Sequence, residues 1–428
     1  MPEPDSTSYL SHIRAFSVNA RRFLAAGALW SLGQALLHLT RNLYWKESGW
    51  TEAGIGTLLS ASQLGTVLCT IPAAILIDRW RSKPLLVLSV FATMAANVGQ
   101  VLCQSRGAVL ASSFAAGAGS AVFLVASAPF FARHSTPRER THLFGVSIGL
   151  AALANVLGAF SVRLLEPWLG HGAEALRTMM LCGAAGGVLA VAPLALLRET
   201  PRPEVPRGLR QLLFARDWGL MLRLCAPDML IGLGAGLTIP FINLYFQGRF
   251  GKSAGDISVY YAASHAMNMT GFLLAPVFSQ RFGKVAVIAG SQLLSIPFFA
   301  FMAFTGSLPV AVAAFLLRSL LMNMAQPVNA AFVMERAAED QQAVMNSFKQ
   351  LSWNGSWTVS ALLGGWLIHG TAVGRDGYTL PMLLTIGCYL SGTTLFLALW
   401  ARRTAPPDSP RTPNAPALPA ITSTGPGD

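Results

Sequence analysis

The sequence predicts an all-α integral membrane protein, in which twelve transmembrane helices form two six-helix bundles related as parallel repeats. Three observations support this fold class: the composition, the number of long apolar segments, and a repeat of half the chain. Of the 428 residues, 53% are apolar and only 12% are charged, and the mean hydropathy is +0.49. Because soluble proteins contain about a quarter charged residues, we expect this chain to fold in lipid.

Twelve segments are long and apolar enough to cross a membrane. A helix needs about 20 mostly apolar residues to span the hydrocarbon core, where it must satisfy its own backbone polar groups. In the first half the predicted spans are residues 23–45, 54–77, 84–104, 107–131, 142–165 and 176–198. In the second half they are residues 218–246, 257–279, 284–305, 308–334, 344–368 and 380–401.

The segments outside the spans divide the chain into bundles and tails. Residues 1–22 are polar and lack a small-residue cleavage site, so we expect an N-terminal tail followed by a retained first helix. Prolines and arginines fill residues 199–217, which we interpret as a linker between a first bundle at 23–198 and a second at 218–402. Residues 403–428 are rich in Pro, Ser, Thr and Ala, a composition typical of disorder.

The positive charges indicate an orientation. The chain has 31 lysine and arginine residues, and those outside the spans are concentrated in the two tails, the linker and the loops on the same side. Because cytoplasmic loops carry an excess of Lys and Arg, both termini are predicted to be cytoplasmic, in a cell (cytoplasmic or inner) membrane. This distribution accounts for the net charge of +12 without a nucleic-acid partner.

An internal repeat relates the two halves. Residues 42–44 and 243–245 both read Asn-Leu-Tyr, 201 positions apart, and each lies near the end of a predicted span. Residues 61–63 (Ala-Ser-Gln) and 263–265 (Ala-Ser-His) match at almost the same offset. Six spans separate the copies, so both run in the same direction. Parallel repeats related by an axis along the membrane normal are typical of one class of secondary transporter.

The loop after the second span resembles the signature of the major facilitator superfamily. That signature has a small residue, three others, Asp-Arg, any residue, Gly, any residue and two basic residues. Here the small residue is Ala74, Asp78-Arg79 match directly and Lys83 is the first basic residue, whereas Arg81 replaces the Gly and Pro84 the second basic residue. The resemblance covers residues 20–402. It implies a monomeric, non-enzymatic secondary transporter without a cofactor, whose bundles rock around a central site.

The resemblance also implies gating residues at the cytoplasmic ends of the helices. A carboxylate against a helix N-terminus gains up to about 1–2 kcal/mol, so Asp78 is expected to lie against the helix that starts near residue 344. Arg79 and Lys83 are expected to bind neighbouring loop groups or lipid phosphates, with ordinary positive-inside anchoring as the alternative.

In the second half Gln280 stands in place of the acid, which predicts a weaker lock there. Arg281 is then expected to pair with Glu335, and Lys284 completes the basic set.

Charged and polar side chains at membrane depth are the candidates for the transport site. A charge in the bilayer centre costs at least about 2.5–3.5 kcal/mol, so its presence favours a role. Arg318 and Asp228 lie well inside spans, in helices that line the cavity in the resembled family. They form either part of a substrate or coupling site, or an interhelical pair that fixes packing. The remaining candidates are His38, Asn42, Asn243, Tyr245, Asn323, Lys349 and Trp353.

The sequence departs from the drug–proton antiporter branch of that family. The branch has an arginine in the fourth span, whereas residues 112–117 here read Ser-Ser-Phe-Ala-Ala-Gly. Leu153-Ala154 replace the Gly-Pro of its fifth span. His38 and Asp228 are the titratable candidates for proton coupling, and for His38 a packing role is the alternative.

The sequence gives little support for nucleotide binding or for a metal site. Residues 251–253 (Gly-Lys-Ser) resemble the end of a phosphate loop, but Phe246 occupies the position of its first glycine. The cysteines and histidines form no metal-ligand pattern, so no metal is expected.

We expect efflux of a small amphipathic organic solute, coupled to protons, with membrane lipid as the other partner. Uptake of a nutrient or metabolite by a permease or facilitator is one alternative, and a transporter-like sensor or scaffold is another.

Overall fold

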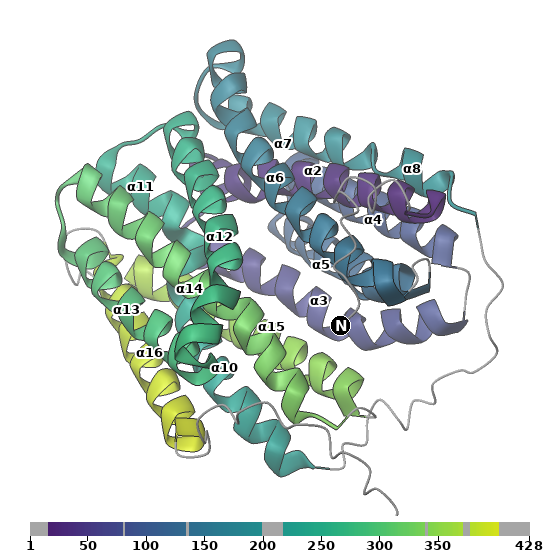
Figure 1. Ribbon diagram of the computed structural model, residues 1–428. Helices are drawn as coiled ribbons and strands as arrows, with labels where there is room; N and C mark the ends of the chain where they lie inside the picture. Colours follow the sequence, from purple (N-terminus) through teal and green to yellow (C-terminus); the bar gives the residue numbers. More distant parts are fainter. Residues whose placement is uncertain are drawn as a thin grey trace, which may run out of the picture.

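A computed structural model describes residues 16–79, 82–133, 137–198, 217–338, 341–370 and 377–401. All regular structure in these ranges is helical (Figure 1). The first half contains α2 (Val18–Glu47), α3 (Glu52–Arg79), α4 (Ser82–Leu102), α5 (Arg106–Arg133), α6 (Pro137–Leu169), α7 (Ala173–Val188) and α8 (Val191–Ala195). The second half contains α10 (Trp218–Thr238), the short 3₁₀ helix η1 (Ile239–Phe241), α11 (Ile242–Phe250), α12 (Ala254–Phe282), α13 (Lys284–Phe304), α14 (Leu308–Arg336), α15 (Gln342–Gly370) and α16 (Thr379–Trp400).

Each of the twelve predicted spans coincides with a helix, and most helices extend a few residues beyond the predicted limits. The first helix starts at Val18, where the Ser17 hydroxyl caps it by accepting from the N–H of Ala20. The first fifteen residues, most of the linker and the whole C-terminal tail (403–428) lie outside the described residues.

Two spans are broken helices rather than continuous ones. In the sixth, Leu189 and Ala190 donate to carbonyls three residues back, which separates α7 from α8. Pro193 lacks the N–H that would continue the α-helical pattern across this point. In the seventh span Pro240 lies inside η1, between α10 and α11, and breaks the helix in the same way.

Within the part of the chain that the structure describes, ten helical segments are long and apolar enough to cross a membrane. The two spans that fall short are α12 and α15, although each has 29 residues. Both carry many Ser, Asn and His side chains, and both pack against the other half of the molecule. On several helices large apolar residues such as Leu88, Leu273 and Leu294 are more than half exposed, as helices in lipid require.

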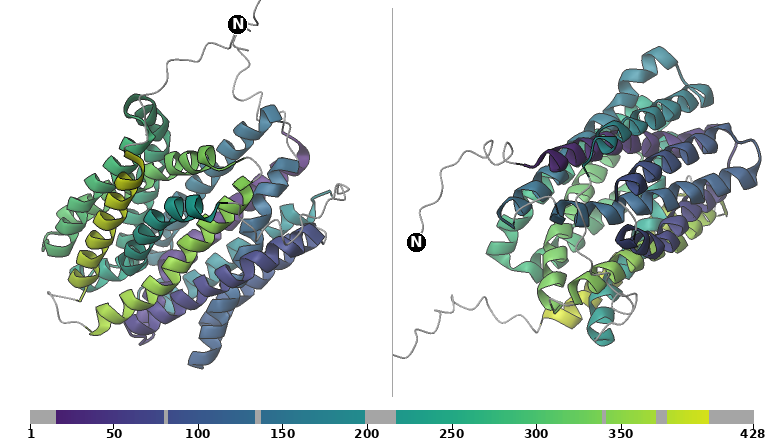
Figure 2. Two further views of the ribbon diagram at one scale, coloured as in Figure 1. Left: turned by 90° about the horizontal axis from the view of Figure 1, so that it is seen from below. Right: turned by 90° about the vertical axis from the view of Figure 1, so that its right-hand side faces the viewer.

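The two halves form adjacent groups of helices (Figures 1 and 2), purple to blue for the first half and green to yellow for the second. Two helix pairs join them extensively: α3 packs on α15, and α6 packs on α12. These pairs are equivalent under the internal repeat, since α3 corresponds to α12 and α6 to α15. The structure therefore has the two-bundle arrangement that the repeat predicts.

Glycine allows the backbones of α3 and α15 to touch. A Cβ atom on Gly56 would lie 2.6 Å from the carbonyl oxygen of Ala361, and Gly365 faces the start of α3 equally closely. Because the obstacle is backbone, no side chain can move aside. The two halves approach at this point only because both positions lack a side chain.

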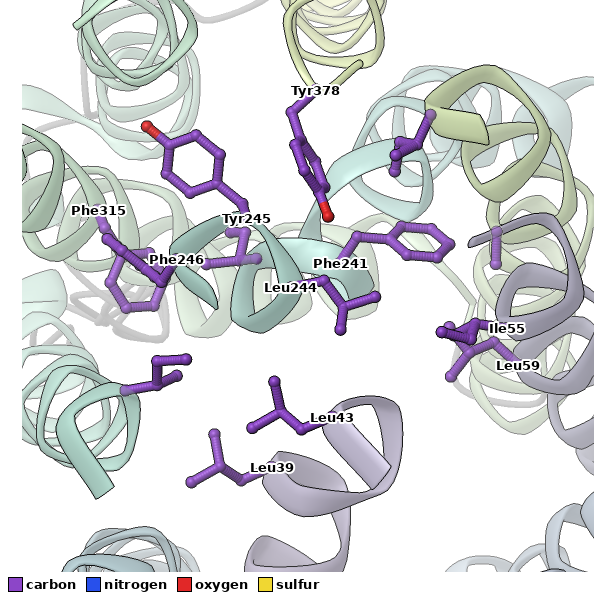
Figure 3. Packing of buried hydrophobic residues seen from close by; sticks show 14 of the residues in the cluster. Leu39, Leu43, Ile55, Leu59, Phe241, Leu244, Tyr245, Phe246, Phe315 and Tyr378 are labelled. Carbon is purple, nitrogen blue, oxygen red and sulfur yellow. The ribbon is translucent and has the colours of Figure 1, made fainter. Parts of the chain in front are cut away.

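Apolar side chains close the space between the halves near one end of the molecule. We call this end, where α2 finishes and α3 begins, the loop face; the opposite end, where the described chain begins and finishes, is the terminal face. Figure 3 shows Leu39 and Leu43 of α2 lying below η1 and α11. The side chains of this apolar plug are Leu39, Leu43, Ile55, Leu59, Phe241, Leu244, Tyr245, Phe246, Phe315 and Tyr378.

Candidate functional site

Repeat-related asparagines join the halves beside the apolar plug. The Asn42 side-chain amide donates to the carbonyl of Pro240 at 2.6 Å, and that of Asn243 donates to the carbonyl of Leu39 at 3.0 Å. The asparagines also face each other, with Nδ2 of Asn42 3.4 Å from Oδ1 of Asn243. The breaks at Thr238 and Pro240 bring the η1 carbonyl to this position. Both side chains are almost fully buried, so they belong to the closure.

A second contact joins α6 to the start of α12. Oε1 of Glu166 accepts from the N–H of Gly255 at 3.0 Å, and its Oε2 accepts from the Ser253 hydroxyl at 3.1 Å. A Cβ on Gly255 would collide with this carboxylate. Arg163, one turn earlier on α6, forms an ion pair with Asp256 at 3.4 Å. A carboxylate at a helix N-terminus is stabilised by the helix dipole, so Glu166 fastens the two halves together.

The equivalent contact between α3 and α15 also combines a serine hydroxyl group with an acidic side chain. The Ser60 hydroxyl donates to the carbonyl of Thr358 at 2.6 Å, and Glu52, at the start of α3, lies 3.6 Å from His369 at the end of α15. All of these contacts between the halves lie toward the loop face. The structure is therefore closed at that face.

A cavity of about 250 Å³ opens within the second half. Side chains of α10, α13, α14, α15 and α16 surround it, so five of the six spans of this half contribute. Its lining consists of Asp228, Ile231, Ala235, Ile239, Gln292, Arg318, Met322, Asn323, Ala325, Gln326, Asn329, Trp353, Trp357 and Tyr389.

The Asp228 carboxylate has both an ion-pair partner and a hydrogen-bond donor at this cavity. Its carboxylate lies 3.1 Å from Nζ of Lys349, and it accepts from the Asn329 amide at 2.9 and 3.0 Å. These contacts tie α10 to α15 and α14. The pair is partly buried and neutral as a whole, which is the arrangement expected of charges held at membrane depth.

Arg318 is in a different situation. Its side chain is 5% exposed, and its guanidinium lies 5.0 Å from the centre of the Phe299 ring. Nε and Nη1 are buried and have no hydrogen-bond acceptor among the described residues. The same is true of Nε1 of Trp357, which also lines the cavity. Two residues of the lining thus carry buried donors without an acceptor among the described residues.

Amides and indoles complete the lining. Asn323 donates to Asn268 of α12 at 2.9 Å and accepts from Gln326 at 2.9 Å. The rings of Trp353 and Trp357 lie 6.2 Å apart on consecutive turns of α15. This combination of aromatic surface and fixed polar groups is typical of a small-molecule site.

The predicted site residues fall into two places. Asp228, Arg318, Asn323 and Trp353 line the cavity, and Lys349 contacts it through Asp228. Asn42, Asn243 and Tyr245 lie instead at the closure; the Tyr245 hydroxyl donates to the carbonyl of Met302 at 2.7 Å. None of these three lines the cavity: Asn42 and Asn243 contact the opposite half, and Tyr245 packs within its own half. His38 is exposed, across from His265 of α12.

The predicted gating residues lie near the terminal face. The side chains of Asp78 and Arg79 are outside the described residues, and Lys83 is half-buried in the first turn of α4. Gln280 and Arg281 are exposed at the end of α12. The expected Arg281–Glu335 pair is not formed: Glu335 pairs with Lys284, which begins α13 and is closer to the end of α14, while Arg281 lies over the Phe282 ring.

Several residues of the site were not predicted. Glu166 lies near the end of a span, where an acid is unremarkable in sequence, and Asn329 is one of many polar residues on α14. Asn329 lies eleven residues after Arg318, which is about three helical turns. This spacing was the available signal that Asn329 and Arg318 share a face of the helix. Phe299 and Tyr389 gave no signal, because aromatic residues are frequent in apolar spans.

Two six-helix bundles related as parallel repeats, with a cavity among the helices of the second bundle, are typical of a membrane transporter. The family model described as Major Facilitator Superfamily matches residues 22–227 and again 224–425. The chain belongs to the major facilitator superfamily, whose members are transporters. Comparison with the curated proteins gives no match.

Solved structures share the fold at low sequence identity. The nucleoside transporter NupG superposes with a TM-score of 0.73 at 16% identity, over 89% of this chain and 98% of that one. A bacterial homologue of the human lysosomal transporter Spinster, in an inward-facing and occupied conformation, gives 0.75 at 15% identity, over 93% and 98%. A bacterial homologue of the iron transporter ferroportin, in the inward-facing state, gives 0.70 at 11% identity, over 89% and 98%.

Proposed function

We propose that this protein is a monomeric secondary transporter that moves a small amphipathic organic solute by alternating access. The cavity beside Arg318 carries the proposal, because it joins aromatic surface to a few fixed polar groups within the helices of one bundle. The contacts of Glu166 and the two asparagines close the loop face, and alternating access requires that they break when the other face closes.

We propose that the termini are cytoplasmic and the loop face is external, so that the structure represents an inward-facing state. The distribution of Lys and Arg supports this orientation. Reporter tags at residue 1, within 199–217 and after residue 428 are expected inside the cell; detection of any tag outside would overturn the orientation.

Efflux coupled to protons is the proposed mode. Asp228 supports coupling, because protonation of its carboxylate would remove the attraction to Lys349 and loosen α10 from α15. The exposed His38 near His265 is a second candidate proton acceptor.

Nucleoside uptake is the second candidate. One structural neighbour is a nucleoside transporter, and a nucleoside offers a flat base for Trp353 and hydroxyl groups for Asn323 and Gln326.

Transport by the purified protein in proteoliposomes tests the proposal. Wild-type protein should exchange a labelled solute chosen by thermal-shift screening, and a pH gradient should drive its accumulation. Asp228→Asn should retain exchange but lose the response to the gradient, because the amide takes up no proton. Glu174→Gln is the matched control, since Glu174 is 85% exposed. Equal gradient-driven flux in Asp228→Asn would remove this residue from coupling, and no exchange of any screened solute would contradict transport.

A further inference from the structure

We propose that Arg318 binds the anionic group of the transported solute, so that the cargo is a small organic anion with an apolar or aromatic body. This inference rests on the proposed function and deepens it by naming the substrate class. The observation behind it is a buried guanidinium that lines the cavity while two of its nitrogens lack an acceptor among the described residues.

The charges of the lining leave one cation uncompensated. Asp228 and Arg318 are the charged residues of the lining, and the Asp228 carboxylate is already held by Lys349 and Asn329. No ion pair between described residues includes Arg318. Because a buried charge is costly unless it is paired and hydrogen-bonded, the site is complete only when a ligand supplies the anion.

The protein neighbours of Arg318 do not replace that anion. The Phe299 ring offers a cation–π contact to one face of the guanidinium, and Tyr261 and Tyr389 interact with it electrostatically. None of the three is a carboxylate. A guanidinium binds carboxylates and phosphates through several hydrogen bonds at once, so an anionic ligand satisfies donors that the aromatic rings leave free.

The rest of the lining selects the body of the solute. Trp353 and Trp357 form an aromatic wall on α15, and Ile231, Ile239 and Met322 add apolar surface. Nε1 of Trp357 is a further donor without an acceptor. The cavity volume of about 250 Å³ lies just below the range of about 300–1,000 Å³ typical of ligand pockets, which favours a small solute.

Outside the cavity, Arg41 of α2 adds a further buried positive charge. Arg41 is 9% exposed, and its buried Nε also lacks an acceptor. Arg41 and His265 both interact electrostatically with His38, which lies one turn before Arg41 on α2. His265 is one turn from Tyr261, a neighbour of Arg318, on α12. An anion entering between the halves would therefore meet the positive charge of Arg41.

Three phenylbutyl probes of different charge, together with a nucleoside and an inorganic anion, test the inference on the full-length protein. The probes are 4-phenylbutyrate, its neutral amide, 4-phenylbutylamine, uridine and inorganic phosphate, and the readout is the dissociation constant from isothermal titration calorimetry. Wild-type protein should bind 4-phenylbutyrate most tightly. Arg318→Met should weaken that binding about 10- to 100-fold, the loss expected for charged hydrogen bonds. Binding of the amide should not change.

Two further variants separate binding from folding. Arg318→Lys keeps the charge and should recover part of the affinity, while its melting temperature shows whether the protein is folded. Arg336→Met is the control on the same helix, eighteen residues or about five turns away, and should bind 4-phenylbutyrate like the wild type.

The inference is overturned if the amide, the amine or uridine binds as tightly as 4-phenylbutyrate, or if folded Arg318→Met keeps the wild-type affinity. If inorganic phosphate binds as tightly as 4-phenylbutyrate, the inference that the solute has an organic body is wrong. Competition by phosphatidylglycerol in nanodiscs, with none from phosphatidylcholine, would assign Arg318 to lipid phosphate instead. Arg318-dependent binding without exchange in proteoliposomes would contradict the transport proposal alone, whereas exchange of uridine without anion binding would contradict only this inference.

Discussion

Asp228 and Arg318 line the same cavity, but their surroundings give them different roles. The Asp228 carboxylate is held by Lys349 and Asn329 from two neighbouring helices. Arg318 contacts an aromatic ring and has nitrogens without acceptors. Sequence alone left open whether these two charges form a pair. Asp228 therefore has an ion-pair partner in this structure, whereas two nitrogens of Arg318 have no acceptor among the described residues.

The pairing of Asp228 with Lys349 predicts coupled effects on stability. In Asp228→Asn or Lys349→Met the remaining charge is partly buried without a counter-ion, so each variant should be destabilised by about 1–3 kcal/mol. The double variant should lose less than the sum of the two. Melting temperatures of the purified protein measure this. Arg177→Met, which breaks an exposed pair with Glu174, should stay within about 0.5 kcal/mol. Strictly additive losses would show that the pair contributes no coupling.

The helices themselves were the most predictable part of the molecule. Apolar segments of about 20 residues mark a span because lipid cannot satisfy backbone polar groups, and all twelve were found. Their ends were less predictable: α6 begins at Pro137 and ends at Leu169, because helical hydrogen bonds continue where the apolar window has stopped. Proline alone does not predict a break, because α12, α13 and α14 each contain one inside a continuous helix. Whether the helix breaks at Pro193 and Pro240 depends on which carbonyl groups accept from the neighbouring N–H groups.

The backbone contact between α3 and α15 predicts that Gly56 cannot accept even a methyl group. In Gly56→Ala the new Cβ would meet the carbonyl oxygen of Ala361, so the helices must separate, at a cost of about 1–3 kcal/mol. The melting temperature should fall accordingly. Gly355→Ala on α15 is the control, because no atom lies within 4 Å of its added Cβ and alanine favours a helix by about 0.5–1 kcal/mol. If both variants melt alike, the seam does not depend on this contact.

The arrangement of the two halves was predictable, whereas the face at which they close was not. The repeat places Asn42 and Asn243 at equivalent positions, and the structure brings them together across the approximate two-fold axis. Closure also depends on pairs such as Glu166 and Gly255, which are 89 positions apart and leave no periodic pattern. Glu166 forms a carboxylate contact with the start of α12 at the loop face, while the contact expected of Asp78 involves a side chain outside the described residues.

The closed loop face predicts a shift in conformation when Glu166 loses its charge. Glu166→Gln replaces two charged hydrogen bonds to the start of α12 by neutral ones and weakens the closure by about 1–2 kcal/mol. Since the terminal face does not use this residue, the population open at the loop face should rise about 5- to 30-fold. Leu43→Cys in a variant without the five native cysteines reports that population, because Leu43 is buried in the apolar plug.

A membrane-impermeant maleimide added to intact cells should therefore label Leu43→Cys faster when Glu166→Gln is present. Glu174→Gln, an exposed acid near the same face, should leave the rate unchanged. Unchanged labelling in Glu166→Gln would show that the apolar plug and the asparagines hold the face closed without the carboxylate. Faster labelling in both variants would indicate a general effect of negative charge at this face. Only a selective increase identifies the α6–α12 contact as a lock that the transport cycle has to open.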